Sequence, residues 1–181
     1  MIAIYCDFDG VINFFGDAGL RDPERHFTDI RYGHVDLPEV YGERRYAQLQ
    51  WAHELVQRMN KLTEEHDVEF IWLTAWRSTA MSILKPMTKL KATRTILWDY
   101  VKGDHTHKYK LHGLVDDLED NTYEGFVWID DFAADDWKNR DIFPWQTPSL
   151  VIEPTPGFGI SRLQMAHIEE FVKKIEKSRV Q

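Results

Sequence analysis

The sequence predicts an α/β protein in which helices cover both faces of a parallel β-sheet. Short apolar runs alternate with longer segments whose apolar residues recur at helical spacing, the order expected of parallel strands joined by helices. The runs are mostly apolar along their length, which is typical of strands buried on both faces. Several end in Asp or Thr, at the position where open α/β sheets place their chemistry.

The first predicted strand, residues 2–6, ends in two aspartates one residue apart, Asp7 and Asp9, followed by Gly10. Asp-x-Asp-Gly also occurs in turns and in calcium-binding loops. A calcium loop needs further acidic residues at regular spacing and a closing glutamate, but here Asn13 is followed by two phenylalanines. A structural turn therefore remains as the alternative to a chemically active pair of carboxylates.

A long irregular segment follows, at about residues 14–45, rich in Gly, Asp, Arg and aromatic residues. It is too long for an ordinary connection, so we expect a lid or binding flap. Within it, residues 25–33 and 35–46 are predicted to pair as a hairpin. Apolar residues then recur at helical spacing and predict an amphipathic helix from about residue 46 to 66.

The rest of the chain continues the alternation of strand and helix. The remaining predicted strands are residues 68–74, 95–98, 126–129 and 149–152. We expect Ser78 to cap the helix after the second strand and Pro86 to kink or end that helix. Two further helices are predicted, one around residues 111–118 and one at 163–175, and Trp76 is expected in the core. Neither repeats nor low-complexity linkers occur, which favours a single domain over residues 1–181.

Composition restricts the possible partners. The formal net charge of −8 argues against broad, nonspecific binding to nucleic acid. The single cysteine, Cys6, falls inside the first strand, where a buried thiol in a reducing compartment is expected. No stretch has the length and apolarity of a membrane span, and no signal peptide is recognisable at the amino end. We expect a cytoplasmic protein with no membrane partner and no stable nucleic-acid binding.

Charge is distributed unevenly along the chain. Residues 85–110 contain seven lysines and arginines against two aspartates, whereas residues 116–136 contain nine acidic residues and no lysine or arginine. One interpretation is a pair of solvated faces. The other is a basic rim for an anionic substrate next to an acidic pocket that binds metal.

Three of the predicted strands end in polar side chains, and a lysine begins one of the helices. These residues are Asp7 and Asp9, Thr74, Asp130 and Asp131, and Lys108 or Lys110. Because the carboxyl ends of parallel strands lie at the same edge of a sheet, we expect acids, a hydroxyl and a cation to meet in one pocket.

This set of residues resembles the four motifs of the haloacid dehalogenase (HAD) superfamily of phosphatases and phosphotransferases. The motifs are Asp-x-Asp-Gly-(Thr/Val), a Thr or Ser ending an apolar strand, a lysine at a helix start, and an acidic pair after another strand. The matches, in chain order, are residues 7–11, Thr74, Lys110 or Lys108, and Asp130 with Asp131. The stretches Asp-Gly-Val-Ile-Asn, Leu-Thr-Ala-Trp and Trp-Ile-Asp-Asp further resemble a minimal-cap branch linked with RNA repair.

The resemblance implies a role for each matched residue. Asp7 is the expected nucleophile, which becomes an aspartyl-phosphate, and Asp9 the expected general acid and base. Thr74 would donate a hydrogen bond to the transferring phosphoryl group, and a lysine would offset its charge. Lys110 is favoured for the lysine because the apolar positions after it fit the family's helix, and Lys108 is the alternative.

The resemblance also implies Mg²⁺ as the cofactor, since this hard cation prefers carboxylate and carbonyl oxygens. The expected ligands are Asp7, the main-chain carbonyl of Asp9, and Asp131. Asp130, which takes the place of the family's glycine, and Asp135 are further candidates for the metal site, and Asp135 is expected to support the ligands.

Residues beside the motifs are expected to contact the substrate. These are Gly10, Ala75 and Arg77, although a solvated position at a helix start is the alternative for Arg77. The family's strand order, 3-2-1-4-5, implies a three-layer Rossmann-like sheet, here with a small flap in place of a large cap domain.

The implied function is a Mg²⁺-dependent phosphohydrolase acting on phosphomonoesters. An open site favours bulky substrates, such as nucleotides or polynucleotide ends. One alternative is a non-catalytic binding or regulatory protein that keeps the fold. Another is a dehalogenase, which Asp9 and Asp131 disfavour because that chemistry needs neither a second Asp nor an acidic metal-binding pair.

Overall fold

A parallel sheet of five strands forms the centre of the molecule. The computed structural model describes residues 1–40, 43–98, 108–132 and 147–179. The strands are β1 (Ile2–Cys6), β4 (Val68–Trp72), β5 (Arg94–Thr95), β6 (Gly125–Ile129) and β7 (Ser149–Ile152). They lie in the order β5-β4-β1-β6-β7, and all four pairings are parallel. This confirms the predicted Rossmann-like sheet and its 3-2-1-4-5 order.

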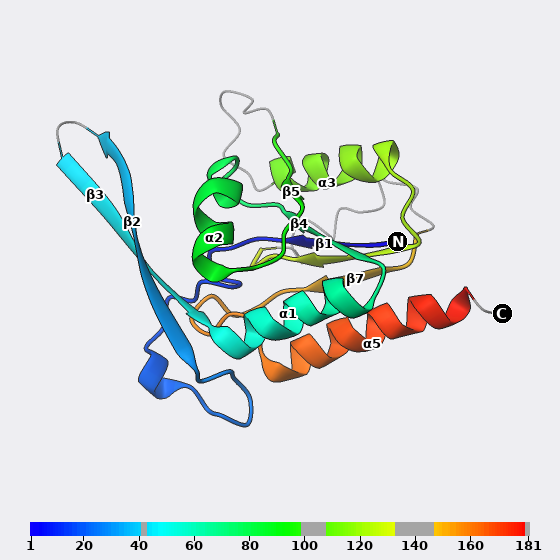
Figure 1. Ribbon diagram of the computed structural model, residues 1–181, viewed down its shortest axis with the longest axis horizontal. Helices are drawn as coiled ribbons and strands as arrows, with labels where there is room; N and C mark the ends of the chain where they lie inside the picture. Colours follow the sequence, from blue (N-terminus) through cyan, green and yellow to red (C-terminus); the bar gives the residue numbers. More distant parts are fainter. Residues whose placement is uncertain (41–42, 99–107, 133–146, 180–181) are drawn as a thin grey trace.

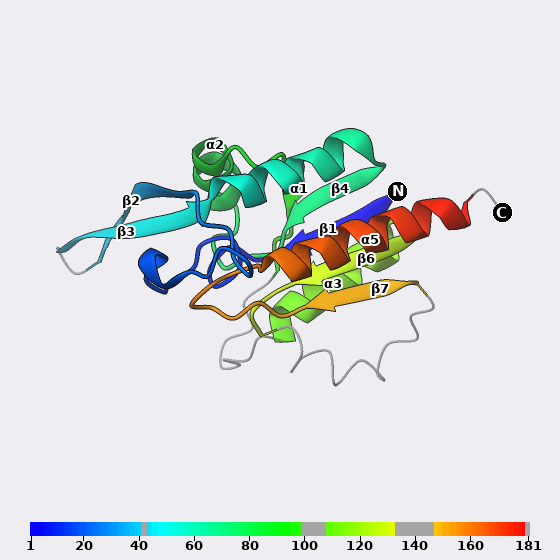
Figure 2. The ribbon, with the colours of Figure 1, turned by 90° about the horizontal axis from the view of Figure 1, so that it is seen from below.

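Helices cover both faces of this sheet. Helices α1 (His53–Glu65) and α5 (Arg162–Ser178) lie side by side on one face, and α3 (Lys108–Asp120) lies on the other (Figures 1 and 2). Because side chains of a strand alternate between faces, β1 contributes to two separate cores. Ile4 packs into the core under α1 and α5, whereas Tyr5 packs into the core under α3.

The strand register brings the polar strand ends to one level. Cys6, the last residue of β1, lies opposite Trp72 of β4 and Ile129 of β6. The backbone N–H of Asp7 then donates to the carbonyl of Ile129, 2.9 Å away. The residues that follow β1, β4 and β6 therefore meet at the carboxyl edge of the sheet.

A long antiparallel hairpin projects beyond this carboxyl edge (Figure 1). Its strands are β2 (Ile30–Val40) and β3 (Glu43–Ala52). A hairpin was expected in the flap, but at residues 25–33 and 35–46, so both strands lie further along the chain than predicted. Within the described residues, the segment between β1 and α1 contains this hairpin and a short 3₁₀ turn, Ala18–Leu20, and no large cap domain.

The predicted start of the first helix at residue 46 is wrong. Residues 46–52 belong to β3, and α1 begins at His53. Leu49 and Trp51 are buried while Tyr46 and Gln48 are exposed, which is the alternation of a half-buried strand. The apolar residues of this stretch fit the helical period that continues through α1 equally well, and pairing with β2 decides the outcome.

The segment after β4 also differs in detail from the prediction. Thr79, not Ser78, precedes the helical residues, and the first of these, Ala80–Leu84, form a π-helical turn. Pro86 lies just after this turn, in the first turn of α2 (Lys85–Thr88), and helical residues continue to Thr88, so it does not end the helix at its own position. The change from π-helical to α-helical geometry lies just before it. No helix in the described part of the chain has the length and apolarity needed to cross a membrane.

Candidate active site

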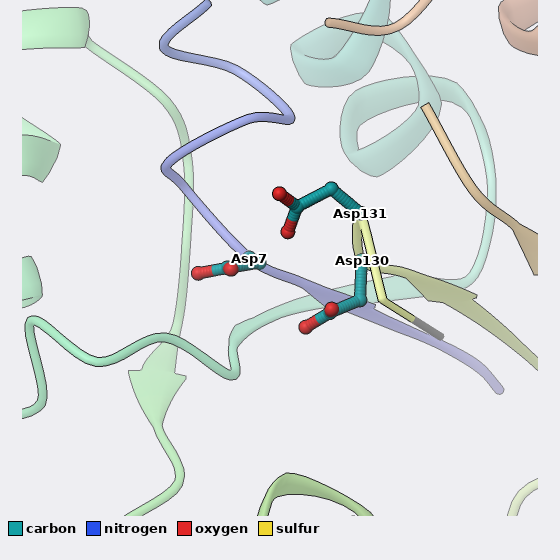
Figure 3. A group of neighbouring side chains, drawn as sticks. All are labelled: Asp7, Asp130 and Asp131. Carbon is teal, nitrogen blue, oxygen red and sulfur yellow. The ribbon is translucent and has the colours of Figure 1, made fainter. Parts of the chain in front are cut away.

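Three carboxylates gather at the carboxyl edge of the sheet. Asp7 directly follows β1, and Asp130 and Asp131 directly follow the neighbouring strand β6. One oxygen from each carboxylate lies within 4.8 Å of the others, and Figure 3 shows the three side chains around one space. Asp7 and Asp130 are buried and Asp131 is half-buried.

A buried lysine, Lys110, contacts two of these carboxylates. The Nζ atom of Lys110, in the first turn of α3, lies 2.5 Å from Asp7 Oδ2 and 2.6 Å from Asp130 Oδ2. Burial alone lowers the pKa of the Lys110 ammonium, but the two carboxylates outweigh burial and raise it, so the lysine stays charged. We call Asp7, Lys110, Asp130 and Asp131 the sheet-edge cluster.

Backbone donors hold the second carboxylate oxygen of Asp7 and of Asp130. The N–H of Phe8 donates to Asp7 Oδ1 at 2.7 Å, and the N–H of Phe132 donates to Asp130 Oδ1 at 2.9 Å. Each of these two carboxylates thus receives an ammonium on one oxygen and an amide on the other. Their orientation is set before any ligand binds.

An ion pair between α3 and the sheet holds the lysine's helix in place. Asp117, two turns after Lys110, accepts two hydrogen bonds from the guanidinium of Arg94 on β5, at 2.6 and 2.8 Å. Tyr5 of β1 donates to the same carboxylate at 2.7 Å. This bidentate contact limits rotation of α3 and keeps Lys110 aimed at Asp7.

The cluster carries more negative charge than its lysine can balance. Burial raises the pKa of Asp7, and the nearby Asp130 carboxylate raises it further, against the effect of Lys110. Burial, together with the Asp130 and Asp7 charges, raises the pKa of Asp131 to about 6. Three acidic oxygens beside one ammonium suit a divalent cation with oxygen ligands. The residues present therefore fit a divalent metal ion, with Asp7 and Asp131 able to hold it.

Gly10 makes room for this arrangement. Its φ of +73° lies in the left-handed region that glycine adopts without strain, and a Cβ at this position would collide with the Asp131 carboxylate. Gly10 was predicted to contact substrate. The structure places it against Asp131, so its lack of a side chain shapes the acidic pocket.

Asp9 faces different partners from Asp7, although only one residue separates them. Asp9 Oδ1 accepts a hydrogen bond from Asn13 Nδ2 at 2.6 Å, and Oδ2 accepts one from the indole Nε1 of Trp76 at 2.7 Å. Burial raises the pKa of Asp9, while these two hydrogen bonds oppose the rise. We call Asp9, Asn13 and Trp76 the Asp9 group.

Two members of the Asp9 group, Trp76 and Asn13, are not among the residues predicted for the site. Trp76 is predicted to lie in the core, and neither residue is given a role, although Asn13 and Trp76 end two of the stretches that resemble the branch linked with RNA repair. Trp76 does pack edge-on against Phe8, with ring centroids 6.0 Å apart, but its N–H is directed at Asp9. Its position two residues after Thr74, in the loop at the same sheet edge, was the available signal.

The other predicted site residues are distributed as follows. Thr74 is fully buried after β4, and its hydrogen bonding lowers the pKa of Asp7. Ala75 is exposed in the same loop. Arg77 is exposed, has a φ of +51°, and donates from Nη2 to the carbonyl of Trp98 at 3.1 Å.

Two predicted residues have side chains that are not described. Lys108 begins α3, but the structure describes only its backbone. Asp135 lies outside the described residues. Of the two lysines considered, Lys110 is the one whose amino group is seen against Asp7.

Comparison with known proteins gives one match. Residues 3–164 match the family described as the HAD domain in Swiss Army Knife RNA repair proteins. No curated protein and no solved structure matches the chain. The family match spans most of the 181 residues and includes the whole sheet-edge cluster and the Asp9 group. The chain belongs to this family of HAD domains, whose members carry phosphohydrolase-type chemistry.

Proposed function

We propose that this domain is a Mg²⁺-dependent phosphatase that hydrolyses phosphomonoesters through an aspartyl-phosphate on Asp7. The observation that carries the proposal is the sheet-edge cluster: a buried carboxylate aligned by Lys110 and by the Phe8 amide, beside two further acids. A phosphate ester is anionic and repels a carboxylate nucleophile, so an attacking Asp needs positive charge around it.

The residues divide the reaction between them. Asp7 attacks phosphorus, the bond to the leaving oxygen breaks, and Asp9 gives its proton to that oxygen. Asp9, now ionised, takes a proton from water as the water attacks phosphorus. The bond to Asp7 then breaks, which releases inorganic phosphate and restores both carboxyl groups.

The positive charge comes from two sources. Lys110 supplies a fixed ammonium at Asp7, and Thr74 offers a hydroxyl beside the same carboxylate. Mg²⁺, held by Asp7, Asp131 and the main-chain carbonyl of Asp9, would neutralise charge on the phosphoryl oxygens. Asp130 keeps Lys110 in place from the far side.

The substrate class we propose is nucleotides or phosphorylated polynucleotide ends. Two observations support it: the described flap is a hairpin and no large cap, which leaves room for a bulky substrate, and the matched family is named for RNA repair. Of the described basic residues of 85–110, Arg94 pairs with Asp117 and Lys91 with Glu64, so they lend no support to a basic rim at the site.

The test measures hydrolysis of p-nitrophenyl phosphate with Mg²⁺ and with EDTA, for the wild type and for Asp7→Asn. We expect turnover that depends on Mg²⁺ and a loss of at least about 10⁴-fold in Asp7→Asn, because the nucleophile is removed. Phosphate release that survives both EDTA and Asp7→Asn contradicts the mechanism. Complete inactivity of the wild type towards all phosphate esters favours the non-catalytic alternative.

Substrate choice is tested by competition. We expect nucleotides and 3′- or 5′-phosphorylated oligonucleotides to be hydrolysed with higher kcat/KM than sugar phosphates. Equal or better turnover of sugar phosphates counts against a bulky substrate.

A further inference from the structure

We infer that Trp76 and Asn13 are positioning residues that fix the carboxyl group of Asp9 so that its proton can go only to the leaving oxygen of the substrate. The inference rests on the proposed function, in which Asp9 is the general acid. It adds two residues and a connection to the hairpin that the family's four motifs do not include.

Both oxygens of Asp9 are held by groups that only donate. The indole Nε1–H of Trp76 has no acceptor atom and donates to Oδ2 at 2.7 Å. The amide of Asn13 donates from Nδ2 to Oδ1 at 2.6 Å. Two donors on two different oxygens set both the plane and the rotation of the carboxyl group.

The orientation of the Asn13 amide is itself determined. Its Oδ1 accepts the backbone N–H of Gln50, on β3, at 2.9 Å. Since a backbone N–H can only donate, the oxygen of Asn13 must face Gln50 and the NH₂ group must face Asp9. The amide cannot flip to accept a proton from Asp9 without losing the bond to β3.

The chemical consequence concerns the protonated form of Asp9. Neither Trp76 nor Asn13, as held here, can accept its hydrogen, so the proton must occupy a lone pair directed away from both. A leaving-group oxygen placed there is the acceptor. In the second half of the reaction, the same free lone pair is available for the proton of the attacking water.

Packing holds both donors in place. The Trp76 ring contacts the ring of Phe8 edge-on, and Phe8 is the residue between Asp7 and Asp9 in the chain. The side chain of Gln50 donates from Nε2 to the carbonyls of Phe14 and Gly16, both at 2.8 Å, which binds the base of the hairpin to the loop that carries Asn13. The hairpin thereby takes part in orienting the general acid.

The chain contains a matched control for Trp76. Trp72 also contacts Phe8 edge-on, with centroids 5.9 Å apart, but its indole N–H has no hydrogen-bond partner among the described residues. Trp72→Phe and Trp76→Phe are the same chemical change next to the same ring. Only Trp76→Phe removes a donor to Asp9.

The experiment compares two substrates of nearly equal size, p-nitrophenyl phosphate and phenyl phosphate, in wild type, Asp9→Asn, Trp76→Phe, Asn13→Ala and Trp72→Phe. Phenolate is the poorer leaving group and depends more on a general acid. The quantity measured is kcat/KM for p-nitrophenyl phosphate divided by kcat/KM for phenyl phosphate. This ratio does not depend on the fraction of folded enzyme, so a loss of stability in a variant cannot alter it.

Because general-acid catalysis is typically worth about 10²–10⁴-fold, we expect the ratio to rise at least about 10²-fold in Asp9→Asn and about tenfold in Trp76→Phe and Asn13→Ala. Trp72→Phe should keep the wild-type ratio. If the ratio rises in Asp9→Asn but stays at the wild-type value in Trp76→Phe and Asn13→Ala, the positioning role is overturned and the proposed function stands. If Asp9→Asn leaves the ratio unchanged, Asp9 is not the general acid, and the proposed function fails at that step together with the inference.

Discussion

The sheet-edge cluster and the Asp9 group hold two carboxylates of one short motif in opposite ways. In the cluster, Asp7 lies against the Lys110 ammonium, with Asp130 on the lysine's other side. In the Asp9 group, both carboxylate oxygens accept from neutral donors, the indole of Trp76 and the amide of Asn13. The Lys110 cation favours the ionised form of Asp7, whereas burial raises the pKa of Asp9 against its two neutral donors and so allows this carboxyl group to take up and release a proton. The partners of each aspartate, rather than its place in the motif, match its proposed role.

The largest effect is expected where charge is paired away from water. Lys110→Met leaves Asp7 and Asp130 without their cation, and breaking a buried ion pair costs about 3–5 kcal/mol. Urea unfolding measures the loss of unfolding free energy, and catalytic activity should fall as well.

A lysine on the surface provides the control for Lys110. Lys61 pairs with Glu65 at 3.7 Å with both side chains mostly exposed, so Lys61→Met should change stability by no more than about 0.5 kcal/mol. Equal effects of the two substitutions would contradict the importance of the buried pair.

A smaller effect on stability is expected at Gly10, which follows Asp9 in the chain and lies against Asp131 of the sheet-edge cluster. Gly10→Ala places a side chain at a left-handed φ and against the Asp131 carboxylate, which should cost about 1–3 kcal/mol. We also expect weaker Mg²⁺ binding, measured by calorimetry, because Asp131 must move.

Gly157→Ala is the control for Gly10, since a Cβ at Gly157 would meet nothing within 4 Å. Its stability and Mg²⁺ affinity should match those of the wild type. If Gly10→Ala also binds Mg²⁺ like the wild type, Asp131 does not need its present position to hold the ion.

The smallest effect on stability is expected for Asp131→Asn. The substitution should stabilise the protein without metal and destabilise it, relative to the wild type, when Mg²⁺ is bound. Without metal, Asp131→Asn removes a charge that burial and the Asp130 and Asp7 carboxylates disfavour, so stability in EDTA should rise by on the order of 1 kcal/mol. With Mg²⁺ at about 100 times its Kd, the wild type should gain about 2.7 kcal/mol and the variant much less.

Thermal unfolding of the wild type and of Asp131→Asn, in EDTA and in Mg²⁺, measures the change in stability without metal and the stabilisation by Mg²⁺. A variant that is less stable than the wild type in EDTA would show that burial and like-charge repulsion do not disfavour the charge of this carboxylate in the folded protein. A variant that keeps the full stabilisation by Mg²⁺ would remove Asp131 from the ligand set.

The positions and ends of most strands could be predicted because they depend on short-range patterns, whereas the strand order was implied by the resemblance to the HAD superfamily. The apolar run before Asp7 and the one before Asp130 are each continuous, and parallel pairing then brings their ends together. The boundary at residues 46–53 could not be predicted, because Leu49 fits both a helical and a strand period until β2 pairs with β3.

The residues of the candidate site that belong to the motifs could also be predicted, whereas the contacts between them could not. Motif spacing identified Asp7, Asp9, Thr74 and the acidic pair, but Lys108 and Lys110 begin the same helix, and only its rotation over the sheet shows which amino group lies against Asp7. Asn13 and Trp76 reach Asp9 through the path of two loops, and no local pattern in the sequence specifies that path.

The most direct measurement of the central claim is acid-quench trapping of the phosphorylated enzyme with ³²P-labelled p-nitrophenyl phosphate and Mg²⁺. Asp9→Asn should be the best variant for trapping, because this leaving group departs without an acid while water attack still needs a base. We predict label that is released by hydroxylamine, maps to the peptide containing position 7, and is lost in the double variant Asp7→Asn/Asp9→Asn. Label that persists in the double variant, or wild-type turnover with no label trapped in Asp9→Asn, would contradict an aspartyl-phosphate on Asp7.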